Sequence, residues 1–208
     1  RFGEWMAHKT YVYISDGGIQ EEVSQGVGRV AGHLGLHHFI MYYDANNIQL
    51  STKVEEVTSE DIAAKYRAWN WNVLSIDGSS VEEIRKALQA ANAEKERPTL
   101  IIGHTVMGKG AVDAKGASYE DKVSPHGQPL SAAGADIDAT IRNLGGNPAK
   151  PFAIFPEVQK IYAHRKEELR TWFLARQKKE EKFRKGHPEL SAKLDLFLSG
   201  KLPKINYS

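Results

Sequence analysis

Two stretches, YVYISDGG at residues 11–18 and FIMYYDANNI at residues 39–48, decide how this chain is expected to fold. Each begins as a run of β-branched and aromatic residues and ends in small or polar residues typical of a turn. The second run does not alternate apolar with polar side chains, which indicates a strand buried on both faces. Strands of this kind belong to parallel sheets covered by helices, so we expect these two strands to lie in one parallel sheet.

The pattern outside these stretches continues the alternation of strands and helices. Strands are predicted at residues 11–15, 38–43, 73–76 and 99–105, and helices at 20–34, 59–70 and 81–94. Successive strands begin about 30 residues apart, the length of a βαβ unit. Thr58 to Asp61 and Ser79 to Glu83 look like helix N-termini with acidic first turns. The predicted fold class is α/β, an open, mainly parallel sheet with helices on both faces, over residues 1–150.

The C-terminal part of the chain has a different character. Residues 108–134 are rich in Gly, Ser, Asp and Pro, and a loop this long is usually functional or disordered. Residues 156–185 and 188–198 are predicted helices, and residues 151–208 are expected to form a helical extension and a linker. Residues 1–150 carry a net charge of −4 and residues 151–208 a net charge of +6. We interpret the long helix as a surface helix.

Composition excludes several classes of protein. The 208 residues are 41% hydrophobic and 26% charged, a balance typical of a folded domain, and the net charge of +2 gives no basic field for nucleic acid. The absence of cysteine excludes disulfides and thiolate metal sites, and we expect a cytoplasmic location. No apolar run approaches the roughly 20 residues of a membrane span. The chain opens with RFGEWMAHKT rather than Met, so a fragment of a longer protein is expected.

Two nucleotide-binding patterns occur but lack the required context. The glycines of GVGRVA at residues 26–31 fall inside a predicted helix, whereas a dinucleotide fingerprint must join a strand to a helix. Close helix packing is the preferred explanation. GHTVMGKG at residues 103–110 resembles a phosphate-binding loop, but Gly110 stands where a Ser or Thr should bind magnesium. The glycines at 108 and 110 would still let the backbone approach a ligand.

A metal site is predicted where the first two strands end. If these strands are parallel neighbours, Asp16 and Asn46 lie side by side at the carboxyl edge of the sheet, where ligands of such folds gather. A carboxylate, an amide oxygen and main-chain carbonyls suit Mg²⁺ or Ca²⁺. Gly17 and Gly18 would offer amides to an anion at a helix start. Taken separately, each motif is also explained by an ordinary turn.

The 30-residue separation of Asp16-Gly17 from Asn46 resembles the thiamine-diphosphate-binding motif of thiamine enzymes. Further stretches are similar to transketolases in their order and spacing. They are SDGGIQEE (15–22), AGHLGL (31–36), YDANNI (43–48), TVMGKG (105–110) and SPHGQPL (124–130). The chain therefore resembles the later part of the transketolase diphosphate-binding domain, followed by the linker to a pyrimidine-binding domain.

The resemblance implies a role for each matching residue. Asp16 and Asn46 would bind the metal through side-chain oxygens and Ile48 through its main-chain carbonyl, and Gly17 would donate its amide to the diphosphate. His126 would lie near the diphosphate and contact the reacting end of the donor sugar. The implied cofactors are thiamine diphosphate and Mg²⁺ or Ca²⁺, and the implied substrates are sugar phosphates.

The resemblance also implies a homodimer that shares its active sites. Glu21 matches an acidic residue of a carboxylate network across that dimer interface, although it is also an ordinary first-turn glutamate. Ser15 replaces the usual first glycine of the turn, and Gly26 replaces a second interface glutamate. The family's upstream histidines and its catalytic glutamate match nothing here, so the segment alone is expected to be inactive.

Two alternatives stay open at this point. The chain could belong to another thiamine enzyme, a 2-oxo acid dehydrogenase α-chain or a deoxyxylulose-phosphate synthase, because the metal motif is shared. It could also be a non-catalytic fragment that binds cofactor or dimerises. The sequence predicts no nucleic-acid partner and no membrane association.

Overall fold

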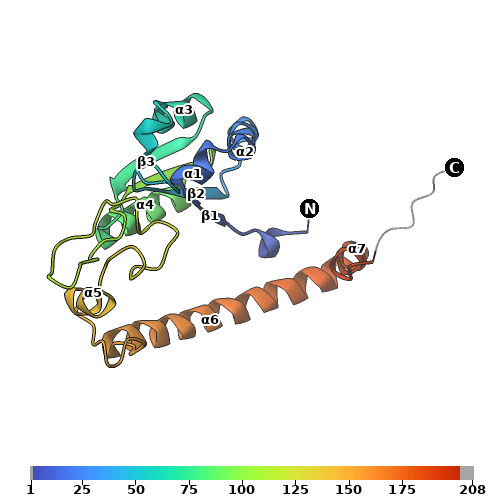
Figure 1. The fold of residues 1–208 in the computed structure, drawn as a ribbon. Helices are drawn as coiled ribbons and strands as arrows, with labels where there is room; N and C mark the ends of the chain where they lie inside the picture. Colours follow the sequence, from blue (N-terminus) through green and yellow to red (C-terminus); the bar gives the residue numbers. More distant parts are fainter. Residues whose placement is uncertain (1, 202–208) are drawn as a thin grey trace. The chain divides into compact units, whose positions relative to one another are not determined.

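The computed structural model describes residues 2–201 of the chain (Figure 1). These residues form two compact units, one of residues 9–151 and another in which residues 2–8 join residues 152–201. The predicted division into domains at residue 150 stays a prediction. None of the described helices is long and apolar enough to cross a membrane.

The larger unit is built on a parallel sheet of four strands. The strands are β1 (Thr10–Ser15), β2 (Phe39–Ala45), β3 (Asn72–Asp77) and β4 (Thr99–His104). Their spatial order is β1-β2-β4-β3, and every neighbouring pair is parallel. All four predicted strands are confirmed. The continuous apolar run Leu100 to Ile102 of the central strand β4 is buried on both faces, whereas the edge strand β1 is largely exposed.

Helices cover both faces of the sheet, as predicted (Figure 1). On one face, Ile19, Ala31 and Tyr66 pack on β2 and β4; they come from α1 (Asp16–Gln20), α2 (Glu22–His33) and α3 (Ile62–Ala68). On the other face, Ala87 and Ala91 of α4 (Val81–Ala93) pack against Ile40 and Ile101. Burial of these side chains, at about 25 cal/mol per Å² of apolar area, holds the layers together.

Two helix boundaries differ from the prediction. The helix expected over residues 20–34 begins later, as α2 at Glu22, because Glu21 adopts an extended backbone (φ −63°, ψ 135°); a short helix that was not predicted, α1, precedes it from Asp16. The start expected at Thr58 is wrong, since the side chain of Asp61 accepts the amide of Ala64 at 2.8 Å and caps α3. Ser80 caps α4 as expected.

The remaining elements lie after β4 and at the N-terminus. Residues 108–134 form turns, followed by α5 (Ile137–Asn143), which the sequence analysis missed. The other unit holds the short 3₁₀ helix η1 (Glu4–Met6), α6 (Pro156–Gly186) and α7 (Pro188–Leu198). The predicted long helix at residues 156–185 and the predicted short helix at residues 188–198 are both confirmed. Trp5 packs on Phe183 with ring centroids 6.0 Å apart, so the N-terminal segment belongs with α6.

The glycines of the rejected dinucleotide pattern lie inside α2. A side chain at Gly28 would meet Tyr66 and Trp69 at 3.2 Å, and the Gly28 carbonyl accepts the indole N–H of Trp71 at 2.8 Å. Close packing therefore explains Gly28. It does not explain Gly26, beside which the structure leaves open space.

Candidate functional site

The candidate site lies where β1 and β2 end side by side. The two strands pair in parallel with Ser15 opposite Asp44, so the residues that follow each strand emerge at the same edge of the sheet. The backbone amide of Asn46 donates to Oδ2 of Asp16 at 3.1 Å. The structure thus brings together the two residues that the sequence analysis placed side by side.

Asp16 is a buried carboxylate, only 2% exposed. Its Oδ1 accepts the hydroxyl of Tyr43 at 2.5 Å, while Oδ2 accepts the Asn46 amide. Burial raises the pKa of Asp16 above its usual value, and the two hydrogen bonds oppose that rise. Each carboxylate oxygen has a further lone pair. A buried acid with this spare acceptor capacity is suited to hold a cation.

The turn after β1 forms although Ser15 replaces a glycine. The hydroxyl of Ser15 accepts the amide of Gly18 at 3.4 Å and caps α1. A side chain added at Gly17 would meet nothing within 4 Å. The backbone of Gly17 therefore borders open space at the start of a helix, where backbone amides favour an anion.

The segment after β2 folds back in a tight turn. Oδ1 of Asn46 accepts the amide of Ile48 at 3.0 Å, and Asn47 adopts a left-handed conformation with φ 65°. Asn tolerates this conformation better than most residues, because its short side chain bonds locally. Ile48 is buried, at 3% exposure. Direct hydrogen bonds therefore join the predicted ligands, from the Asn46 amide to the Asp16 carboxylate and from the Ile48 amide to the Asn46 side chain.

His126 lies in the loop that follows β4, in the larger unit. Its Nδ1 is buried and has no hydrogen-bond partner among the described residues. The next residue, Gly127, has φ 74°, and a side chain there would lie 3.4 Å from Leu50, two residues beyond Ile48. The loop of His126 therefore packs against the segment that follows Asn46. A buried polar nitrogen without a partner is uncommon in a folded protein, which makes His126 a candidate to hydrogen-bond a ligand.

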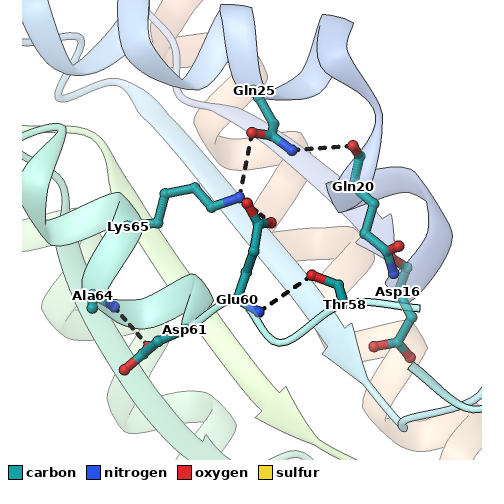
Figure 2. Close-up of polar contacts among 8 residues, drawn as sticks. All are labelled: Asp16, Gln20, Gln25, Thr58, Glu60, Asp61, Ala64 and Lys65. Atoms are coloured by element: carbon teal, nitrogen blue, oxygen red, sulfur yellow. Dashed lines mark hydrogen bonds and ion pairs between the residues drawn. The ribbon is translucent and has the colours of Figure 1, made fainter. Parts of the chain in front are cut away.

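Glu21 is exposed at the break between α1 and α2, where a network of polar contacts begins (Figure 2). Gln20 donates to the carbonyl of Asp16 at 3.0 Å, and Gln25 donates to the carbonyl of Gln20 at 3.1 Å. Lys65 of α3 bonds to Gln25 at 3.3 Å and to Glu60. Side chains of both α1 and α2 therefore hold the chain at the break, through Gln20 and Gln25, while Glu21 is exposed.

A hollow of about 400 Å³ opens at the carboxyl edge of the sheet. Its lining includes Asn46, Asp44, Tyr13 and residues 105–108, so the glycine-rich segment after β4 does border a cavity. The sequence analysis did not single out Tyr13, Tyr43 or Asp44. Their position could have identified them, since all three lie on the two predicted strands that end at the site.

The donor set fits a hard divalent cation. Within residues 2–201, His, Asp and Glu side chains form no group of three that could hold a metal. The candidate site instead offers one carboxylate, one amide oxygen and main-chain carbonyls. Mg²⁺ accepts few protein ligands and commonly completes its shell with phosphate oxygens and water. The open space beside Gly17 leaves room for such a phosphate.

Comparison with known proteins decides the family. Residues 3–203 match the model of the transketolase family, thiamine diphosphate binding domain. This chain belongs to the transketolase family. It is 36% identical to a transketolase of Geobacillus stearothermophilus, over 96% of the chain and 29% of that protein, and 33% identical to a dihydroxyacetone synthase of Pichia angusta, over 96% and 27%.

Solved transketolase structures share the fold. The enzyme of Leishmania mexicana superposes with a TM-score of 0.85 at 27% identity, over 96% of this chain and 29% of that one. A Pichia stipitis transketolase in complex with sedoheptulose 7-phosphate gives 0.82 at 29% identity, over 94% and 28%. These findings do not favour the other thiamine enzymes. The chain spans less than a third of the length of these relatives.

Proposed function

We propose that this chain forms the metal- and diphosphate-binding part of a transketolase. Such an enzyme transfers a two-carbon ketol unit from a ketose phosphate to an aldose phosphate. The observation that supports this proposal is the hydrogen bond from the backbone amide of Asn46 to the carboxylate of Asp16, at one edge of a parallel sheet. The family match over nearly the whole chain supports it independently.

Each residue of the site has a proposed role. Asp16 and Asn46 would hold Mg²⁺ or Ca²⁺ through side-chain oxygens and Ile48 through its carbonyl, while Gly17 donates its amide to the diphosphate. When bound, thiamine diphosphate supplies the carbanion chemistry that cleaves and forms the C–C bond. His126 would hydrogen-bond the reacting end of the donor sugar and orient it, which its unpartnered Nδ1 supports.

The proposal extends to partners and location. We propose a homodimer that shares its active sites, in which the exposed carboxylate of Glu21 faces the partner subunit. Sugar phosphates would be the substrates, which the sedoheptulose 7-phosphate complex of the Pichia stipitis relative supports. A cytoplasmic location would suit a chain without cysteine.

Calorimetry on the full-length protein tests the central role of Asp16. Thiamine diphosphate with Mg²⁺ should bind the wild type, whereas Asp16→Ala should weaken binding by about 100-fold or more, because the metal loses its only charged protein ligand. Asp77→Ala is the matched control, since Asp77 is an exposed aspartate at the end of β3, the opposite edge strand of the same sheet. Equal affinity of the wild type and Asp16→Ala would contradict the proposal.

The isolated 208 residues allow a second test. We expect the isolated segment to show no ketol transfer from a ketose phosphate to an aldose acceptor, because matching relatives are more than three times longer. Turnover by the purified segment in a coupled assay would contradict this expectation. Turnover of pyruvate by the full-length protein would instead favour the other thiamine enzymes.

A further inference from the structure

Asp44, the sixth residue of β2, collects three hydrogen-bond donors on one carboxylate. Oδ2 accepts the hydroxyl of Tyr13 at 2.5 Å and the side-chain amide of Asn46 at 3.4 Å. Oδ1 accepts the hydroxyl of Thr105. These donors come from β1, from the turn after β2 and from the residue after β4, so a single side chain ties together the ends of three strands.

The partners of Asp44 are themselves held in place. The ring of Tyr13 stacks on the ring of Tyr42, with centroids 5.9 Å apart and planes within 6°. Tyr42 occupies the space above Gly103, where an added side chain would lie only 1.9 Å from its hydroxyl oxygen. Gly103 therefore leaves room for Tyr42, and Tyr42 supports Tyr13. Asp44 is thus held between rigid groups rather than on a free surface.

Two contacts of Asn46, one of them with Asp44, set which end of its amide faces outward. An amide carries an oxygen at one end and an NH₂ group at the other, and a carboxylate only accepts hydrogen bonds. Asp44 therefore stabilises the orientation in which the NH₂ group of Asn46 faces β2. The amide of Ile48, which donates to Oδ1, favours the same orientation. A metal ion binds only the oxygen end.

We propose that Asp44 is a positioning residue that fixes the amide of Asn46 with its oxygen available to a divalent cation. The inference rests on the proposed function, because it concerns the same site. It goes further because it gives a positioning role to the Asp44 carboxylate, which is not one of the proposed metal ligands. Groups that orient metal ligands in this way typically contribute about 10- to 100-fold to metal affinity.

A double-mutant cycle on the full-length protein tests the inference. The affinity for Mg²⁺ is measured by calorimetry at saturating thiamine diphosphate in the wild type, Asp44→Asn, Asn46→Asp and the double variant. Asp44→Asn should weaken Mg²⁺ binding by about tenfold or more, since its own amide no longer selects one orientation. In the Asn46→Asp background the cost should vanish, because a carboxylate presents an oxygen either way round.

Asp77→Asn controls for the loss of charge. Asp77 also carries a charge that acts on Tyr42, but its side chain accepts the amide of Ser79, whereas the side-chain amide of Asn46 donates to Asp44. If Asp44 acts by contact, Asp77→Asn should leave the affinity for Mg²⁺ within about twofold of the wild type. An equal loss in both variants would show a simple charge effect and overturn the inference.

Thermal denaturation without ligand checks that the variants fold. If Asp44→Asn unfolds, Thr105→Val replaces it, since it removes one donor to Asp44 and conserves shape; it should weaken Mg²⁺ binding by about threefold. Wild-type affinity in Asp44→Asn or in its replacement, or an equal cost in both Asn46 backgrounds, overturns the inference. Absence of Mg²⁺-dependent binding in the wild type would instead contradict the proposed function itself.

Discussion

The sheet carries two Asp-Gly turns that look alike in sequence and differ in structure. Asp16-Gly17 follows β1 and begins α1, whereas Asp77 ends β3 and Gly78 lies in the turn before α4. Asp16 is buried against Tyr43 and the Asn46 amide, whereas Asp77 is exposed and its carboxylate accepts the nearby amide of Ser79. The segment after β2, rather than the Asp-Gly sequence itself, buries Asp16 and makes its turn the candidate site.

Substitution of the glycine should destabilise the protein in the second turn but not in the first. Gly78→Ala should lower the free energy of unfolding by about 2–3 kcal/mol, because the new methyl group would lie 2.5 Å from Thr105 and 2.9 Å from the Tyr42 hydroxyl. Gly17→Ala should leave the free energy of unfolding unchanged or raise it slightly, because the site has open space and Ala favours a helix. Denaturant unfolding measures both.

Cofactor binding gives a second way to test the turn after β1. Gly17→Ala should weaken thiamine diphosphate binding by about tenfold, since its methyl group enters the space that we assign to the diphosphate. If Gly17→Ala binds as well as the wild type, the diphosphate does not lie beside Gly17.

A smaller effect is expected from Tyr43→Phe, which removes the hydroxyl donor to Asp16. Burial raises the Asp16 pKa and this hydrogen bond opposes the rise, so its loss should raise the pKa further. Metal binds the ionised carboxylate. The loss of Mg²⁺-dependent binding on acidification should therefore begin at a higher pH than in the wild type. Titrations from pH 5 to 8 measure this shift, and an unchanged or lower onset would contradict it.

The smallest expected effect concerns the cap of the second turn. Ser80→Ala removes the hydroxyl that accepts the Glu83 amide at 3.3 Å and should lower the free energy of unfolding by about 1 kcal/mol. Because this turn stabilises α4 and takes no part in the proposed site, cofactor affinity should not change. A loss of affinity without loss of stability would show that the two turns are not separate.

The sequence predicted the central strands β2 and β4 because buried parallel strands read as continuous apolar runs, and it predicted the edge strands from their β-branched and aromatic residues. It also predicted that Asp16 and Asn46 meet, because parallel neighbours end at the same edge. It could not predict the convergence of Tyr13 and Thr105 on Asp44, since that requires β4 to lie beside β2. Strand order depends on how helices pack across the sheet, and periodicity carries no information about it.

The helix boundaries were missed for a local reason. Periodicity continues through Glu21, but side chains fix the break there, with Gln25 donating to the Gln20 carbonyl. Asp61 replaces Thr58 as the cap of α3 because its carboxylate lies three residues before the amide that it accepts. Several polar residues near a helix start can serve as caps, and only the path of the chain selects among them.

The most direct measurement is the position of a bound cation in a crystal of the full-length protein with thiamine diphosphate and Mn²⁺, located by anomalous scattering. The account predicts a peak about 2.0–2.6 Å from oxygens of both Asp16 and Asn46, with the diphosphate on its open side. A peak bound to other residues, or a diphosphate distant from Gly17, would contradict it.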